Sequence, residues 1–95
     1  MEHLLSEVAG VSVAALAERY GTPFFAYDRA VIEQRIADLA GFETVRFAQK
    51  ACSNIAILAL MRSHGIVVDA VSAGEIYRAL RAGYSPAGHP PGIVY

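Results

Sequence analysis

The strongest constraint on the fold is a regular alternation of short apolar runs and helical patterns in the second half of the chain. Runs typical of strands and patterns typical of helices follow one another at residues 45–49, 54–64, 66–71, 73–82 and 92–95. Strands that alternate with helices of about ten residues form parallel sheets through right-handed crossovers. The sequence therefore predicts a βαβαβ arrangement of the α/β class.

The last of these strands, GIVY at 92–95, has no helix after it to cover it. A parallel sheet of three strands keeps open edges. The run at 66–71 is nearly continuously apolar, which is typical of a strand covered on both faces. We expect about the first three strands of an eight-stranded β/α barrel of the TIM type, so the chain reads as the N-terminal part of a larger fold.

The first half of the chain predicts a helix at 13–20, a strand at 22–27 and an amphipathic helix at 29–40. Its third element carries Ile32, Ile36 and Leu39 on one stripe. Glycines that follow helical patterns predict left-handed caps at Gly21, Gly41, Gly65 and Gly83. We divide the chain at residue 28, with the barrel portion over 29–95.

Composition argues for a globular, cytoplasmic chain. Hydrophobic residues make up 55% of it and charged residues 18%, with a net charge of −1 and no basic block, which speaks against nucleic-acid and membrane partners. A single cysteine, Cys52, cannot form an internal disulfide, and the first residues lack the pattern of a secretory signal. The three histidines, His3, His64 and His89, lack metal-ligand spacing.

Lys50 is the first candidate for chemistry. Strand alternation over 45–50 places it on one face with Arg46 and Ala48. In a β/α barrel the carboxyl ends of strands line the active-site mouth, and a partly dehydrated amine there loses its charge and attacks carbonyl groups more easily. On spacing alone, a solvated lysine at a strand end is the simpler interpretation.

Asp69, Ser72 and Glu75 form the second candidate group, in the stretch VVDAVSAGEI. The spacing of Ser72 and Glu75 matches a capping box, in which each side chain satisfies a backbone N–H group at a helix start. Asp69 lies in an otherwise apolar strand and needs a partner if it is buried. Barrel geometry makes Lys50, one strand away, the nearest candidate cation.

Four blocks, GTPFFAYD, VRFAQKACSN, VDAVSAGEIYRALRAGYSP and GIVY, closely resemble in order and spacing the N-terminal part of the diaminopimelate decarboxylase family. These are pyridoxal-phosphate enzymes with a barrel of the alanine-racemase type. The likeness runs from about Gly21 to Tyr95. Gln49 and Cys52 depart from the block that is commoner in the wider family, which bears on the substrate pocket and leaves the lysine in place.

The resemblance implies that Lys50 holds pyridoxal phosphate as a Schiff base and that Asp69, Ser72 and Glu75 lie near the cofactor. It also implies that 23–28 is a strand joined to a C-terminal β domain, that the substrate is a small amino acid, and that the full enzyme is a homodimer. The phosphate loop and the late catalytic residues of the family fall beyond Tyr95, so we expect the 95 residues alone to be inactive. Alternatives are a related decarboxylase of ornithine, arginine or carboxynorspermidine, and a non-catalytic module that binds the cofactor.

Overall fold

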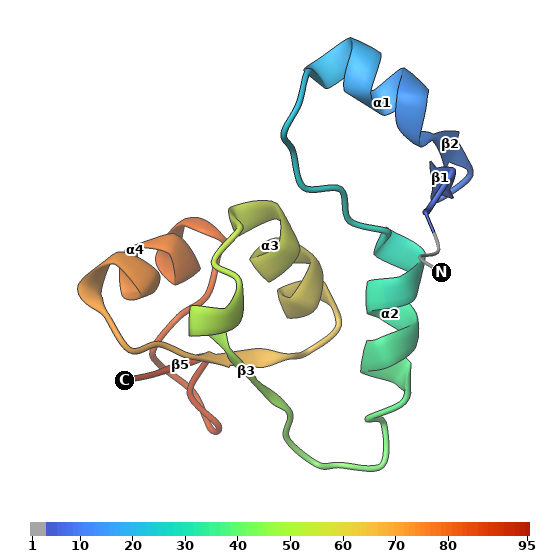
Figure 1. The fold of residues 1–95 in the computed structure, drawn as a ribbon. Helices are drawn as coiled ribbons and strands as arrows, with labels where there is room; N and C mark the ends of the chain where they lie inside the picture. Colours follow the sequence, from blue (N-terminus) through green and yellow to red (C-terminus); the bar gives the residue numbers. More distant parts are fainter. Residues whose placement is uncertain (1–3) are drawn as a thin grey trace. The chain divides into compact units, whose positions relative to one another are not determined.

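The computed structural model describes residues 4–95 and divides the chain into two compact units, Met1–Asp38 and Leu39–Tyr95 (Figure 1). His3 lies outside the described residues. Within residues 4–95, no helix combines the length and the apolar character that a membrane crossing requires.

The first unit begins with a hairpin that the sequence patterns do not predict. Strands β1 (Glu7–Val8) and β2 (Val11–Ser12) pair antiparallel across a two-residue turn. Both turn residues, Ala9 and Gly10, have positive φ angles, 52° and 77°, as a type I′ turn demands. Strands of two residues are too short to show an alternating pattern, which is why sequence reading misses them.

Helix α1 (Val13–Tyr20) has the predicted bounds and begins where the Ser12 hydroxyl accepts a hydrogen bond from the Ala15 N–H at 3.2 Å. The stretch 22–27 that follows was expected to be a strand and has no regular secondary structure. A strand is defined by its ladder partner, and none of the described residues provides one. Pairing of this stretch with another domain stays a prediction.

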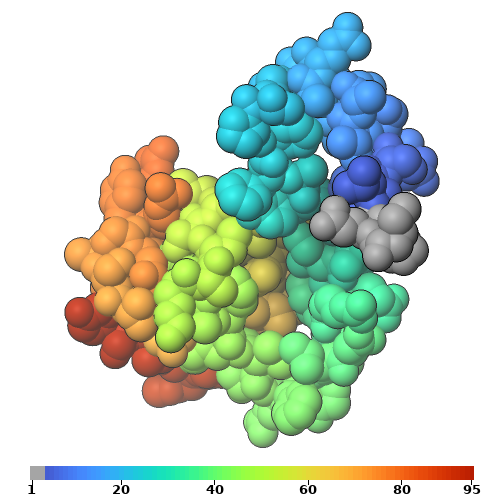
Figure 2. Space-filling model, viewed as in Figure 1, coloured from blue at the N-terminus to red at the C-terminus, as the bar shows by residue number. Residues whose placement is uncertain are grey.

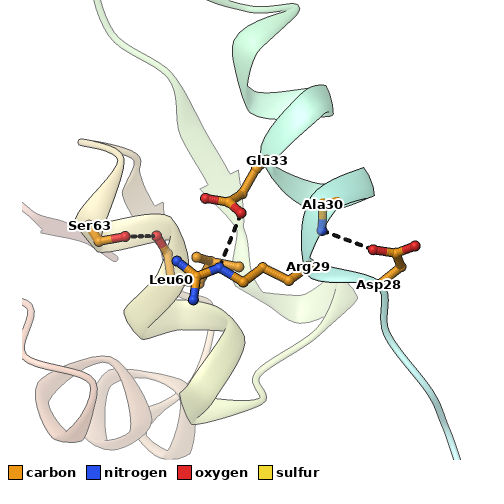
Figure 3. Close-up of polar contacts among 6 residues, drawn as sticks. All are labelled: Asp28, Arg29, Ala30, Glu33, Leu60 and Ser63. Carbon is orange, nitrogen blue, oxygen red and sulfur yellow. Dashed lines mark hydrogen bonds and ion pairs between the residues drawn. The ribbon is translucent and has the colours of Figure 1, made fainter. Parts of the chain in front are cut away.

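Helix α2 (Arg29–Ala37) starts at Asp28, whose carboxylate accepts the Ala30 N–H at 2.9 Å (Figure 3). An ion pair of 3.1 Å between Arg29 and Glu33 spans its first turn. The helix ends three residues before the predicted Ala40, and its predicted apolar stripe is at most half-buried in this structure.

The second unit confirms the predicted βαβαβ order. Strands β3 (Arg46–Ala48), β4 (Val67–Asp69) and β5 (Ile93–Val94) form a parallel sheet in that order. Helices α3 (Ile55–Ser63) and α4 (Ala73–Arg81) connect them and lie on one face of the sheet (Figure 1). The strands are shorter than predicted; both outer strands have a ladder partner on one side only within this unit.

The core of the second unit lies between the sheet and the two helices. Its buried members are Leu58, Val68, Ala70, Ala79, Ala82, Tyr84 and Ile93, with Phe47 and Ile76 packed against them. The side chains that alternate with these on the strands form the other face of the sheet, which we call the open face. Its members are Arg46, Ala48, Val67, Asp69 and Val94, all exposed or half-buried.

Two features hold the strands together at the edge of the sheet where they begin. The Arg46 guanidinium donates to the Val68 carbonyl at 2.6 Å and to the Pro91 carbonyl at 3.0 Å, which ties β3 to its neighbour β4 and to the loop before β5. At Gly92 an added Cβ would collide with the Ser85 carbonyl oxygen, so the loop before β5 folds back closely on the strand start.

The predicted glycine caps are confirmed at three of four positions. Gly21, Gly65 and Gly83 have positive φ angles after α1, α3 and α4. Gly41 does not, because α2 has already ended at Ala37.

Candidate functional site

The carboxyl ends of the three parallel strands meet at one edge of the sheet. Ala48, Asp69 and Val94 are register partners there, each the last residue of its strand. Lys50 follows Ala48 by two positions, and Ser72 follows Asp69 by three. In α/β folds this is the edge at which ligands bind, because the loops that leave it can present side chains without disturbing the sheet.

The alternation predicted Lys50 at the end of a strand, and this prediction is wrong. The strand ends at Ala48, and Lys50 lies in a 3-10 turn, η1 (Gln49–Ala51). Its side chain is exposed and makes no hydrogen bond or ion pair within the described part of the chain. It is also the single lysine of the sequence, the other seven cationic residues being arginines. The edge therefore presents one primary side-chain amine.

The turn that carries Lys50 is fixed by hydrogen bonds to one carbonyl. The Gln49 carbonyl accepts from the Cys52 N–H at 3.0 Å and from the Ser53 hydroxyl at 3.2 Å. Immediately afterwards the Asn54 side chain accepts the N–H groups of Ala56 and Ile57 and starts α3. The backbone on both sides of Lys50 is thus held in place.

Sequence reasoning treated Gln49 only as a departure from the common pattern, but its side chain has an unusual environment in the structure. Gln49 is completely buried and is the only buried polar residue in the described part of the chain. Its Nε2 donates to the Glu75 carbonyl in the first turn of α4 at 2.6 Å, and its Oε1 has no hydrogen-bond partner. The available signal was the alternation over 45–50, which places the polar Gln49 on the same face as the apolar Val45 and Phe47.

Asp69 lies half-buried on the open face, opposite Ala48 on β3 and Val94 on β5. Lys50, the candidate cation for Asp69, forms no ion pair with it among residues 4–95. The backbone leaves the ladder after Ala48, which carries Lys50 away from the row in which Asp69 stands. Both groups nevertheless remain at the same edge of the sheet.

Ser72 and Glu75 form the predicted cap of α4, with one difference. The Ser72 hydroxyl accepts the Glu75 N–H at 3.1 Å and donates to the Glu75 carboxylate at 3.2 Å. The other carboxylate oxygen accepts the N–H of Val71 at 3.3 Å, where an ideal capping box would use that of Ser72. Both residues hold the helix start in place, and neither forms a hydrogen bond or ion pair with Lys50 in the part of the chain that the structure describes.

A model of the family described as "Pyridoxal-dependent decarboxylase, pyridoxal binding domain" matches residues 30–95, which include the whole of this edge. The chain belongs to this family of pyridoxal-dependent decarboxylases, for which pyridoxal phosphate is the cofactor. The predicted class is thereby confirmed.

Comparison with individual relatives points to one enzyme within this family. The chain is 50% identical over 90 residues to the diaminopimelate decarboxylase of Escherichia coli and 52% identical over 86 residues to that of Streptomyces coelicolor. These alignments cover 95% and 90% of this chain but 21% and 20% of the relatives. The chain therefore spans about a fifth of the length of the curated relatives that it matches.

A solved structure agrees with the sequence relatives. A crystal structure of diaminopimelate decarboxylase matches 84% of this chain with a TM-score of 0.80 and 56% identity, over 19% of its own length. This confirms the predicted α/β fold as the N-terminal part of a pyridoxal-binding barrel.

The residues at the carboxyl edge fit this cofactor. An exposed amine without protein partners can condense with an aldehyde, which an arginine cannot do. Ala48, the last strand residue below Lys50, is small and exposed, so the chain itself leaves space beside the amine. Lys50 is the residue of this chain with the right chemistry to hold pyridoxal phosphate.

Proposed function

We propose that this chain is the N-terminal part of a diaminopimelate decarboxylase, which converts meso-2,6-diaminopimelate into L-lysine and carbon dioxide in the last step of lysine biosynthesis. The single observation that carries the proposal is Lys50, the only lysine, standing at the carboxyl edge of a sheet in a segment that the family model matches. Relatives of about 50% identity over nearly the whole chain support this substrate.

In this proposal Lys50 attaches the cofactor covalently through Nζ. When bound, pyridoxal phosphate accepts the electron pair that is released as the substrate carboxylate leaves as carbon dioxide. Asp69 places a carboxylate at the same edge, which favours positively charged groups of a ligand there. Ser72 and Glu75 serve the site indirectly, because they fix the start of α4 against the edge.

The wider organisation is part of the same proposal. Residues 29–95 contribute to the barrel, and residues 1–28 form a separate N-terminal portion in which 23–28 pairs with a C-terminal β domain. The whole protein acts on a small amino-acid substrate as a homodimer in the cytoplasm. Identity with the curated relatives over most of this chain supports this organisation.

Covalent labelling tests the role of Lys50. The full-length protein is incubated with pyridoxal phosphate, reduced with borohydride and digested, and the modified peptides are identified by mass spectrometry. We expect the label on Lys50. Arg81→Lys supplies a matched control, because it adds a second exposed amine on α4 away from the edge. Equal labelling of both positions, or none at Lys50, would overturn the proposal.

Turnover tests the substrate. The full-length protein loaded with pyridoxal phosphate, without borohydride reduction, should release carbon dioxide from diaminopimelate faster than from ornithine, arginine or carboxynorspermidine. Preference for one of the latter would assign a related decarboxylase, and labelling without turnover would assign a non-catalytic module. We expect residues 1–95 alone to release no carbon dioxide; activity there would contradict the view that the rest of the site lies beyond Tyr95.

A further inference from the structure

We propose that Gln49 is a positioning residue, which sets the place of the Lys50 amine by fastening its turn to helix α4. The inference rests on the proposed role of Lys50. It starts from a contrast within two adjacent residues: the Gln49 side chain is completely buried, whereas that of Lys50 is exposed and has no partner in residues 4–95.

The position of Lys50 depends on its backbone, because its side chain has no hydrogen bond or ion pair within residues 4–95 that would hold it. That backbone is the turn η1, and its first residue is Gln49. The Gln49 Nε2 donates to the Glu75 carbonyl at 2.6 Å, which joins the turn to the first turn of α4. Its own carbonyl accepts from Cys52 and Ser53, on the other side of Lys50.

Helix α4 also holds the far side of the turn. The Arg78 guanidinium donates to the Ser53 carbonyl at 3.4 Å, one helical turn after Glu75. Figure 2 shows the yellow-green atoms that follow β3 lying against the orange atoms of α4. Lys50 therefore lies between two attachments to one helix, of which the buried amide is the shorter.

The unpartnered Oε1 of Gln49 argues against a purely stabilising role. A buried acceptor without a partner carries a desolvation penalty that offsets much of what the other half of the amide contributes, and an apolar side chain of the same shape is often neutral or better. What an apolar side chain cannot supply is the directional bond to Glu75. The geometry points to placement of the turn as the role of the amide.

The variant Gln49→Met in the full-length protein tests this, since methionine keeps the unbranched shape and removes the bond. We expect kcat to fall about tenfold with KM nearly unchanged, in line with other residues that orient a reacting group through hydrogen bonds. Labelling of Lys50 by pyridoxal phosphate should slow. Without cofactor, hydrogen exchange of the Cys52 amide should accelerate about fivefold, the factor that one ordinary hydrogen bond supplies.

Ser63→Ala is the matched control. The Ser63 hydroxyl also donates to a helix carbonyl at 2.6 Å, that of Leu60, but within α3 and away from the turn. It should leave the Lys50 labelling rate and the Cys52 amide unchanged. Unaltered labelling and unaltered exchange in Gln49→Met would overturn the proposal.

If Gln49→Met does not fold, Gln49→Leu replaces it, because leucine also lacks the donor to the Glu75 carbonyl. Faster exchange at Cys52 with slower labelling supports the proposal, and wild-type behaviour in both overturns it. The exchange measurement uses no cofactor. It therefore reports on Gln49 even if the wild-type protein is not labelled at Lys50, an outcome that would defeat the proposed function separately.

Discussion

Two connections leave the same edge of the sheet, one from β3 to α3 and one from β4 to α4, and they are closed in different ways. Both end in a side chain that caps the next helix, Asn54 in the first and Ser72 in the second. The second is closed by local bonds among Val71, Ser72 and Glu75. The first, which carries Lys50, also has local bonds, from Cys52 and Ser53 to the Gln49 carbonyl, and adds a bond from the Gln49 side chain to a carbonyl 26 positions further along.

The two connections also differ in their proposed roles: the one from β4 to α4 serves to start a helix, and the one from β3 to α3 presents the amine of Lys50. A locally bonded turn forms wherever its few residues occur, as the capping box does. A turn fastened over a long distance takes its final position only when the neighbouring strand-helix unit is in place. The residue with the most specific chemistry is thus located by tertiary structure, and the capping residues are located by their own sequence.

The largest expected effect comes from removing the amine that the first connection presents. Lys50→Ala in the full-length protein should abolish covalent labelling by pyridoxal phosphate and lower decarboxylation by about 10³-fold or more, the scale for loss of a positioned reacting group. Single-turnover assays and mass spectrometry measure both. If Lys50→Ala were still labelled at another residue and still released carbon dioxide, the first connection would not carry the reacting amine, and the two connections would not differ in their chemistry.

The next effect concerns the other end of β3, where a second long-range tie is found. Arg46→Met removes bonds to the carbonyls of Val68 and Pro91 while keeping the apolar stem. Because Arg46 is half-buried, we expect a loss of about 2 kcal/mol in the free energy of unfolding, measured by urea titration. A loss below that of a single surface hydrogen bond would show that long-range ties are not what holds β3.

The two caps provide a direct test of the comparison. Ser72→Ala and Asn54→Ala should each lower the free energy of unfolding by about 1 kcal/mol, because each removes the acceptor at a helix N-terminus. Ser72→Ala also removes the donor to one oxygen of the Glu75 carboxylate, and Asn54→Ala removes the acceptor of two N–H groups, so the two effects should be similar in size. Urea titrations of both variants side by side measure the two losses, and a loss for Ser72→Ala well below that for Asn54→Ala would contradict the assignment of the second connection as the locally bonded one.

An effect no larger than that of the caps is expected at neutral pH at the opposite edge of the sheet, where the Tyr84 hydroxyl donates to the Ile66 carbonyl at 2.7 Å. Tyr84→Phe should lower stability by about 1 kcal/mol at pH 7. Burial raises the pKa of Tyr84 from 10.0 to about 12, so the folded protein holds this proton more tightly than the unfolded chain. Its contribution is complete below pH 10 and is lost as the pH rises through 12.

The pH dependence supplies the control for that variant. The stability difference between wild type and Tyr84→Phe, followed from pH 9 to pH 12, should shrink above pH 10. A difference that stays constant over this range would show that the phenol is not the group that titrates.

Sequence patterns predicted the parallel βαβαβ order and the position of α4, because amphipathic spacing, end glycines and the Ser72 cap act over a few residues. The same local reasoning extended β3 to Lys50, since alternation carries no signal for where a strand turns into a 3-10 helix. It also could not find the tie between Gln49 and Glu75. That bond joins residues far apart in the chain, and no periodicity relates them.

The close approach between Gly92 and the Ser85 carbonyl restricts the residue types that this position of the fold accepts. A side chain at residue 92 would have to push the Ser85 carbonyl aside, and the loop before β5 would move with it. The preceding residue, Pro91, supplies one of the two carbonyls that hold the Arg46 guanidinium. One added methyl group at residue 92 would thus displace a hydrogen-bond partner of Arg46, which lies on β3, two strands away from β5. Natural variation at residue 92 should therefore be confined to glycine, even though the residue has no part in the chemistry.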